Sequence, residues 1–170
     1  ECTPQERARR VAFLLTTRPA AESLTVQDVL DTARLPHRGA TTPSADRLVT
    51  LRAAQRCGVA DWLSRPLRTL SDGQVQWVML ARVLAQDPPL LLLDEPTAHL
   101  DLPGKRALFA LLLNLAREEG RTIIASTHDL LPICHEVSAW WLLHEGRLQC
   151  GSPTNTRLRQ TVGEVLETVV

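Results

Sequence analysis

Apolar residues are arranged along this chain in two ways, as short continuous runs and as longer stretches with helical spacing. A short apolar run bounded by turn residues is typical of a strand buried within a parallel sheet. Such runs predict strands at residues 11–15, 90–94, 121–126 and 139–143. After the last run, the pair Glu145-Gly146 predicts a hairpin turn into a further strand at residues 148–150.

Helices are predicted in most of the intervals between the strands. Thr25 and Asp28 have the spacing of a capping box, so one helix is expected to begin there and to end near Leu35. Further helices are predicted over residues 44–57, 71–85, 101–120 and 129–136, with a weak one in the tail after residue 151. The helix at 44–57 is predicted to bury the face that carries Leu48, Leu51 and Ala54.

The order of these elements predicts an α/β fold. Strands alternate with helices in the second half of the chain, which is typical of a parallel sheet with crossover helices. The middle of the chain is helical throughout, which indicates an α-helical subdomain inserted into the sheet. A chain of 170 residues fits one domain and can bury a substantial core.

Composition narrows the class of protein. Hydrophobic residues at 44% and charged residues at 22% are ordinary for a soluble globular protein. Lys+Arg and Asp+Glu balance at 19 each, and this lack of basic excess argues against a general nucleic-acid binder. The 4 cysteines lack metal-ligand spacing and are expected to be reduced thiols. No apolar run approaches the roughly twenty residues of a bilayer span, so no direct membrane insertion is predicted.

Asp94 and Glu95 stand at the carboxyl end of a predicted parallel strand, where α/β sheets place their ligands. A magnesium–triphosphate complex needs one carboxylate near the metal and another to orient the attacking water. Adjacent strand residues point to opposite faces, so the two acids can serve both tasks. Acids also end buried strands simply because the chain meets solvent there, so this pair alone leaves the function open.

The turn Ser71-Asp72-Gly73-Gln74 is predicted to open the helix at residues 71–85. Backbone N–H groups and the positive end of the helix dipole face outward together at such a point, which favours anion binding. A serine in this place is also an ordinary helix N-cap. The turn therefore has a structural role and a candidate binding role.

Residues 70–101 run LSDGQVQWVMLARVLAQDPPLLLLDEPTAHLD. This order resembles the ATP-binding subunit of ABC transporters, in which a signature motif, a Walker B strand and a D-loop follow one another. The resemblance implies an ABC ATPase fold, a partial RecA-like P-loop NTPase sheet with an inserted helical subdomain. It divides the chain into a core strand and Q-loop region (1–21), the helical subdomain with the signature motif (22–87), the RecA-like core (88–150) and a tail (151–170).

The resemblance also implies roles at the site of hydrolysis. Asp94 would hold Mg²⁺ through water, and Glu95 would be the general base that polarises the attacking water. His128, in Ser-Thr-His-Asp, matches the switch histidine that bonds the γ-phosphate of ATP. A histidine after a strand is otherwise an ordinary loop residue, and the order of the motifs is what favours this role.

Other roles implied by the resemblance concern a dimer of such subunits. The signature residues would bind the γ-phosphate of ATP held by the other subunit: Ser71, Asp72, Gly73 and Gln74. Asp101 matches the D-loop aspartate that communicates across the dimer, and it would also cap a helix. Thr16 stands at the place of the Q-loop glutamine that contacts magnesium and links the site to the membrane partner.

Some features depart from the family's pattern. No Gly-x-x-x-x-Gly-Lys-Ser/Thr phosphate loop occurs in the 170 residues, so the chain is expected to be a truncated cassette that lacks the Walker A portion and the first strands. Asp72 replaces a usual glycine, and Trp77 replaces a usual basic residue. The hydroxyl of Thr16 reaches less far than glutamine, so only the location of the Q-loop carries over.

Softer markers at residues 24–29, 33–37 and 100–103 bring the resemblance closest to subunits that power importers of iron-siderophore, haem or cobalamin. The implied partners are ATP, a second copy or paired ABC subunit, and a transmembrane permease. The implied location is the cytoplasmic face of the cell membrane, reached through that permease.

Two alternatives remain open. The chain could be an inactive fragment or degenerate subunit, because a cassette without the phosphate loop is expected neither to bind ATP tightly nor to hydrolyse it. A soluble ABC protein of translation or DNA repair fits less well, because Thr127-His128-Asp129-Leu130 stands where translation factors usually carry Ser-His-Asp-Arg. The long coiled coil of the repair proteins has no counterpart here.

Overall fold

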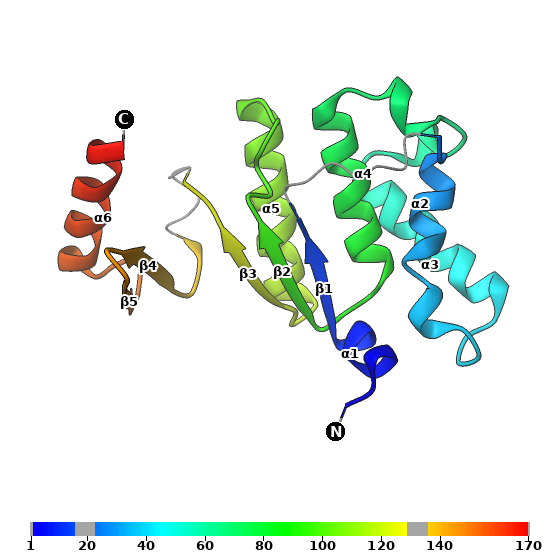
Figure 1. The fold of residues 1–170 in the computed structure, drawn as a ribbon, viewed down its shortest axis with the longest axis horizontal. Coiled ribbons are helices and arrows are strands. Elements are labelled where there is room, and N and C mark those ends of the chain that lie inside the picture. Colours follow the sequence, from blue (N-terminus) through cyan, green and yellow to red (C-terminus); the bar gives the residue numbers. More distant parts are fainter. Residues whose placement is uncertain (1, 16–22, 129–135, 170) are drawn as a thin grey trace.

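A parallel sheet of 3 strands lies at the centre of the computed structural model, which describes residues 2–15, 23–128 and 136–169 (Figure 1). Helix α1 (Pro4–Arg10) leads directly into β1 (Val11–Leu14) at one edge of the sheet. β2 (Leu90–Asp94) lies in the middle and β3 (Thr122–Ser126) at the other edge. The α/β fold with a parallel sheet predicted from the sequence is confirmed.

One face of this sheet is covered by α4 (Asp72–Ala85) and α5 (Leu102–Glu118). Buried residues of β1 and β2 share the core with α4 and α5: Ala12, Leu14, Leu91, Leu93, Val78, Leu108 and Leu115. On the opposite face, Phe13 and Ile124 remain 54% and 39% exposed. The prediction of strands buried on both faces was therefore wrong for β1 and β3, because the described helices cover one face only.

The helical subdomain consists of α2 (Val26–Thr32), the 3-10 turn η1 (Leu35–His37) and α3 (Pro43–Arg56), packed against α4. The capping box of Thr25 and Asp28 is present, but α2 ends at Thr32, earlier than expected, and Pro36 lies inside η1. The short turns η2 (Ala60–Trp62) and η3 (Leu67–Thr69) then connect α3 to α4.

The buried face of α3 agrees with the predicted one at Ala54 but not at the two leucines. Leu48 and Leu51 are 49% and 39% exposed, whereas Thr50, Ala53 and Ala54 are buried. The small residues share one stripe of the helix, and they allow α3 to pack closely against α4. Apolar spacing alone pointed to the leucines, but the packing partner selected the small side chains.

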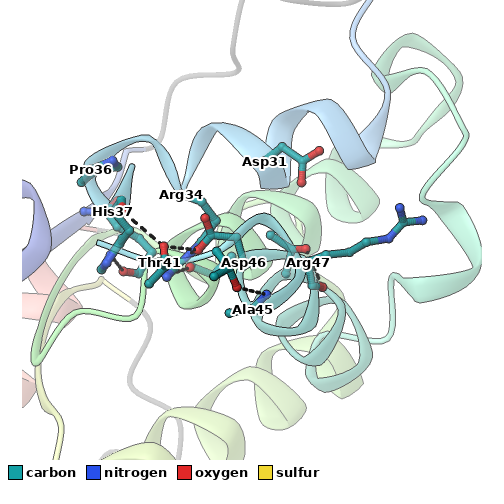
Figure 2. Close-up of polar contacts among 12 residues, drawn as sticks. Asp31, Arg34, Pro36, His37, Thr41, Ala45, Asp46 and Arg47 are labelled. Carbon is teal, nitrogen blue, oxygen red and sulfur yellow. Dashed lines mark hydrogen bonds and ion pairs between the residues drawn. The ribbon is translucent and has the colours of Figure 1, made fainter. Parts of the chain in front are cut away.

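A polar cluster joins the end of α2 to α3 and α4 (Figure 2). The buried guanidinium of Arg34 donates to Asp46 Oδ1 at 2.8 Å and to the Ala85 carbonyl oxygen at 2.8 Å. Thr41 donates to the same Asp46 oxygen, also at 2.8 Å. These bonds fix the subdomain to the carboxyl end of α4, because a buried arginine is stable only when its charge and its N–H groups are paired.

The carboxyl-terminal part contains a second, two-stranded sheet. Among the described strands, β4 (Trp140–His144) pairs with β5 (Arg147–Gly151) alone, in antiparallel orientation. Helix α6 (Thr156–Val169) follows, with Leu158 and Val162 buried. The expectation that the strand at 139–143 extends the parallel sheet was therefore wrong. The turn between the strands agrees with prediction, since Glu145 and Gly146 have φ of +48° and +71°.

Two further expectations concern the helix predicted at residues 129–136 and the lack of a membrane-spanning segment. The helix predicted at residues 129–136 falls almost wholly on residues 129–135, outside the described part. Among the helices that the structure describes, none combines the length and the apolar character needed to cross a membrane.

Candidate active site

The carboxyl ends of β2 and β3 bring Asp94, Glu95 and Ser126 together. Asp94 lies beside Ser126 in the strand register. The hydroxyl of Ser126 donates to Asp94 Oδ1 at 2.7 Å and accepts the backbone N–H of Glu95 at 3.0 Å. Glu95 has a φ of +44°, so the chain turns sharply as it leaves the strand. One side chain of β3 thus contacts both acids of β2.

His128 lies next to Glu95, with its Nδ1 3.0 Å from Glu95 Oε1. The His128 side chain is 74% exposed, whereas the Glu95 side chain is 27% exposed. The other oxygen, Glu95 Oε2, is buried and makes no hydrogen bond to the described residues. A buried carboxylate oxygen without a donor is costly, and such atoms in folded proteins often have a catalytic or ligand-binding role. The two residues predicted to be catalytic are therefore adjacent.

The predicted signature turn begins α4, as expected. Ser71 Oγ accepts the N–H of Gln74 at 3.3 Å, and the Gln74 side chain accepts the N–H of Ser71 at 3.0 Å. Both side chains are thus used as a capping box in this chain. Asp72, exposed at the surface, is the first residue of the helix. The capping role is established, and the role in binding phosphate stays a prediction.

Gly73 allows a close approach, and the group that approaches it is the backbone of the loop after β2. A Cβ at this position would lie 2.9 Å from the carbonyl oxygen of His99, which is closer than real side chains approach. The first turn of α4 therefore sits directly against the loop that follows Glu95. Sequence reasoning assigned this glycine to a ligand, and the structure assigns it at least to this loop contact.

Gln76 was not predicted as a site residue. Its buried side chain donates to the carbonyl oxygen of Pro96 at 2.9 Å, which joins α4 to the residue after Glu95. Ser126 was likewise missed as a site residue. A glutamine at a buried helix position is a sequence signal for such a contact, whereas Ser126 becomes visible only once the register of β2 and β3 is known.

Three further residues were singled out from the sequence, and their outcomes differ. Asp101 caps α5 and accepts the N–H of Gly104 at 2.9 Å, as predicted from the sequence. Its proposed contact across a dimer stays a prediction. Thr16 lies outside the described residues. Trp77 is half-buried against the core, so its ring serves packing where a basic residue is usual in the family.

Magnesium fits this site only as part of a nucleotide complex. Among the residues that the structure describes, no group of three or more His, Cys, Asp or Glu side chains is arranged to hold a metal ion. Asp94 offers hard carboxylate oxygens at the solvent end of β2, one of them bonded by Ser126. A single carboxylate suits Mg²⁺ that keeps waters and is held mainly by phosphates.

Comparison with known proteins identifies the family. The model of the family described as ABC transporter matches residues 3–98, more than half of the chain. The chain belongs to the ABC transporter family. Within this family, it is 40% identical over 125 residues to the iron(3+)-hydroxamate import ATP-binding protein FhuC of Bacillus subtilis, a match that covers 72% of this chain and 46% of that protein.

Two further relatives extend the comparison. The ABC family member FepC of Escherichia coli, a ferric enterobactin transport ATP-binding protein, is 36% identical over 85% of this chain and 54% of its own length. The cobalamin import ATP-binding protein BtuD of Halobacterium salinarum is 34% identical over 91% of this chain and 39% of its own length. The chain spans about half the length of the curated relatives it matches.

Solved ABC structures share the fold. An inward-facing metal-chelate type ABC transporter superposes with a TM-score of 0.77 at 27% identity, covering 86% of this chain and 59% of that one. The dimeric cassette MJ0796 gives 0.78 at 25% identity, covering 89% and 66%. Another dimeric structure of MJ0796 is a post-hydrolysis state bound to ADP and Pi.

Proposed function

We propose that this chain is the part of an ABC importer's ATP-binding subunit that carries the general base for ATP hydrolysis. The observation that carries the proposal is the Glu95–His128 pair, with Glu95 Oε1 held 3.0 Å from the imidazole and Glu95 Oε2 buried without a hydrogen-bond partner among the described residues. An oxygen in that condition is suited to accept a hydrogen bond from water.

In the proposed reaction, Glu95 Oε2 orients a water molecule and accepts a proton from it as the water oxygen attacks the γ-phosphorus of ATP. The bond between that phosphorus and the bridging oxygen of ADP breaks, which yields ADP and inorganic phosphate. His128 contacts the Glu95 carboxylate and would bind the γ-phosphate, and Asp94 would hold the magnesium of the nucleotide. Bound magnesium neutralises charge on the phosphates.

The proposed cargo is an iron-siderophore, haem or cobalamin. Relatives named for import of iron(3+)-hydroxamate, hemin and cobalamin and for transport of ferric enterobactin support this class. The proposed partners are a second ABC subunit and a transmembrane permease. The dimeric MJ0796 cassettes support the first, and the metal-chelate transporter supports the second. The subunit would then sit on the inner face of the cell membrane.

The test is Glu95→Gln in the protein expressed from its own gene. The amide keeps the shape of the side chain but is not a base, so turnover of ATP is expected to fall by at least about 100-fold while nucleotide binding persists. Phosphate release measures the first quantity, and binding of a fluorescent ATP analogue measures the second. Full turnover in this variant would exclude Glu95 as the base, and a wild-type protein without ATPase activity would favour a degenerate subunit.

A further inference from the structure

We propose that Ser126 is a positioning residue that aligns Asp94 and Glu95 for hydrolysis, an inference that rests on the proposed function. Its hydroxyl is bonded to both acids, 2.7 Å from Asp94 Oδ1 and 3.0 Å from the backbone nitrogen of Glu95. Ser126 belongs to β3, whereas the acids lie at the end of β2. Its hydrogen bonds therefore join the ends of the two strands.

The direction of the two hydrogen bonds follows from the chemistry of the groups. A backbone N–H can only donate, and an ionised carboxylate can only accept. Ser126 Oγ therefore accepts from Glu95 through a lone pair and gives its single proton to Asp94. A hydroxyl is the side-chain group that can do both from one atom, so alanine would remove both bonds at once.

The bond to Glu95 holds a strained piece of backbone. A φ of +44° is uncommon for a residue with a side chain and costs energy unless its surroundings fix it. Ser126 binds the N–H of Glu95, and on the other side the Glu95 carbonyl oxygen accepts the N–H of Ala98 at 3.0 Å. The peptide groups on both sides of the Glu95 Cα are thereby fixed.

This fixed backbone sets the direction of the Glu95 side chain. The conformation places Oε1 beside His128 and leaves Oε2 buried without a donor among the described residues. The same oxygen atom also donates to Asp94, so one hydroxyl contacts both acids and helps to align them. Small losses of alignment at a reacting centre lower the rate strongly.

The experiment compares Ser126→Ala and Ser126→Thr in the protein expressed from its own gene. Threonine keeps the hydroxyl, suits a strand, and finds room for its methyl group because position 126 is exposed. We expect Ser126→Ala to lower kcat about 10-fold with the KM for ATP changed less than about twofold, and Ser126→Thr to retain kcat within about threefold. Thr122→Ala, an exposed hydroxyl lost at the other end of β3, is the matched control and should leave kcat unchanged.

A second readout does not depend on turnover. Hydrogen exchange of the Glu95 amide, followed by NMR, should be faster in Ser126→Ala and protected in Ser126→Thr and in Thr122→Ala. An unchanged Glu95 exchange rate or a wild-type kcat in Ser126→Ala would overturn the proposal. Full turnover in Glu95→Gln would instead overturn the proposed function, so the two failures are distinguishable.

Discussion

Strands β2 and β3 carry charged residues at both ends, and the two ends use them differently. At the amino ends, Arg121 donates to Asp87 at 2.7 Å, to Glu119 at 3.0 Å and to the Pro88 carbonyl oxygen at 3.3 Å. Glu119 also pairs with Arg56 of α3. Each of these charges thus has an opposite charge as its partner within the chain.

At the carboxyl ends the pairing is incomplete. Asp94 and Glu95 share Ser126, and His128 contacts one oxygen of Glu95, but Glu95 Oε2 is buried without a hydrogen bond to the described residues. Complete pairing stabilises a fold, whereas an unpaired buried oxygen costs stability and suits a ligand. The comparison predicts that substitutions at the amino end change stability and that substitutions at the carboxyl end change chemistry.

Among the substitutions that test this comparison of the two ends, His128→Ala should have the largest effect. The imidazole is 74% exposed, so its loss should leave thermal stability nearly unchanged. Glu95 would lose its neighbour, and we expect kcat for ATP to fall about 100-fold, or about 2.7 kcal/mol of transition-state free energy. Steady-state phosphate release and a thermal melt measure the two quantities. His144→Ala, an exposed histidine at the end of β4, is the control and should change neither.

The next effect concerns the opposite end of the strands. Arg121→Met keeps the length of the side chain but removes the cation shared by Asp87, Glu119 and the Pro88 carbonyl. Because Arg121 is 15% exposed, we expect the free energy of unfolding to fall by about 2 kcal/mol, measured by urea denaturation. Arg117→Met removes an exposed pair with Glu136 and should cost less than about 0.5 kcal/mol. A large loss of kcat in Arg121→Met would contradict the separation of the two ends.

The features that were predictable from the sequence are those encoded by neighbouring residues. The capping box of Thr25 and the N-cap of Ser71 each lie within four consecutive positions, and both are present. The turn at Glu145-Gly146 depends on backbone conformations that glycine supplies. Such local signals define where elements begin and end, whatever they pack against.

The features that escaped prediction depend on contacts between distant segments. The role of Ser126 requires the register that sets it beside Asp94, and apolar runs do not specify register. The buried residues of α3 are those that face α4, a segment distant from them in the sequence. Strand β4 pairs with β5 and not with the parallel sheet, which the apolar run at β4 does not reveal. The adjacency of Glu95 and His128 was expected because the order of motifs resembles a known family, not because of any local pattern.

A smaller effect is expected from pH. The hydrogen bond from Arg56, aided by that from Arg121, holds the pKa of Glu119 below its usual 4.5, against the opposing effect of burial. A carboxyl whose pKa is lower in the folded state stabilises the protein above its unfolded pKa, and this stabilisation is lost as the pH falls through the folded pKa. We expect Glu119→Gln to be less stable than wild type by about 1 kcal/mol near neutral pH.

The same variant provides the check on the sign. The difference in unfolding free energy between wild type and Glu119→Gln should shrink as urea denaturation is repeated at pH values below about 4.5, because wild-type Glu119 then becomes neutral as well. A difference that stays constant with pH would remove Glu119 from the ionic network.

The smallest effect is expected for Asp87→Asn, which tests how much charge alone contributes at the amino ends. Asp87 has a φ of +55°, a conformation that asparagine tolerates as well as aspartate does, so the backbone should be unaffected. The substitution removes only the negative charge facing Arg121, in a side chain that is 53% exposed. The free energy of unfolding should fall by about 0.5 kcal/mol at low salt, and the difference should vanish in concentrated salt because exposed charges are screened. A loss that persists at high salt would mean that the Asp87 carboxylate acts through hydrogen-bond geometry and not through its charge. The amino ends would then depend on directed hydrogen bonds, as the carboxyl ends do at Ser126.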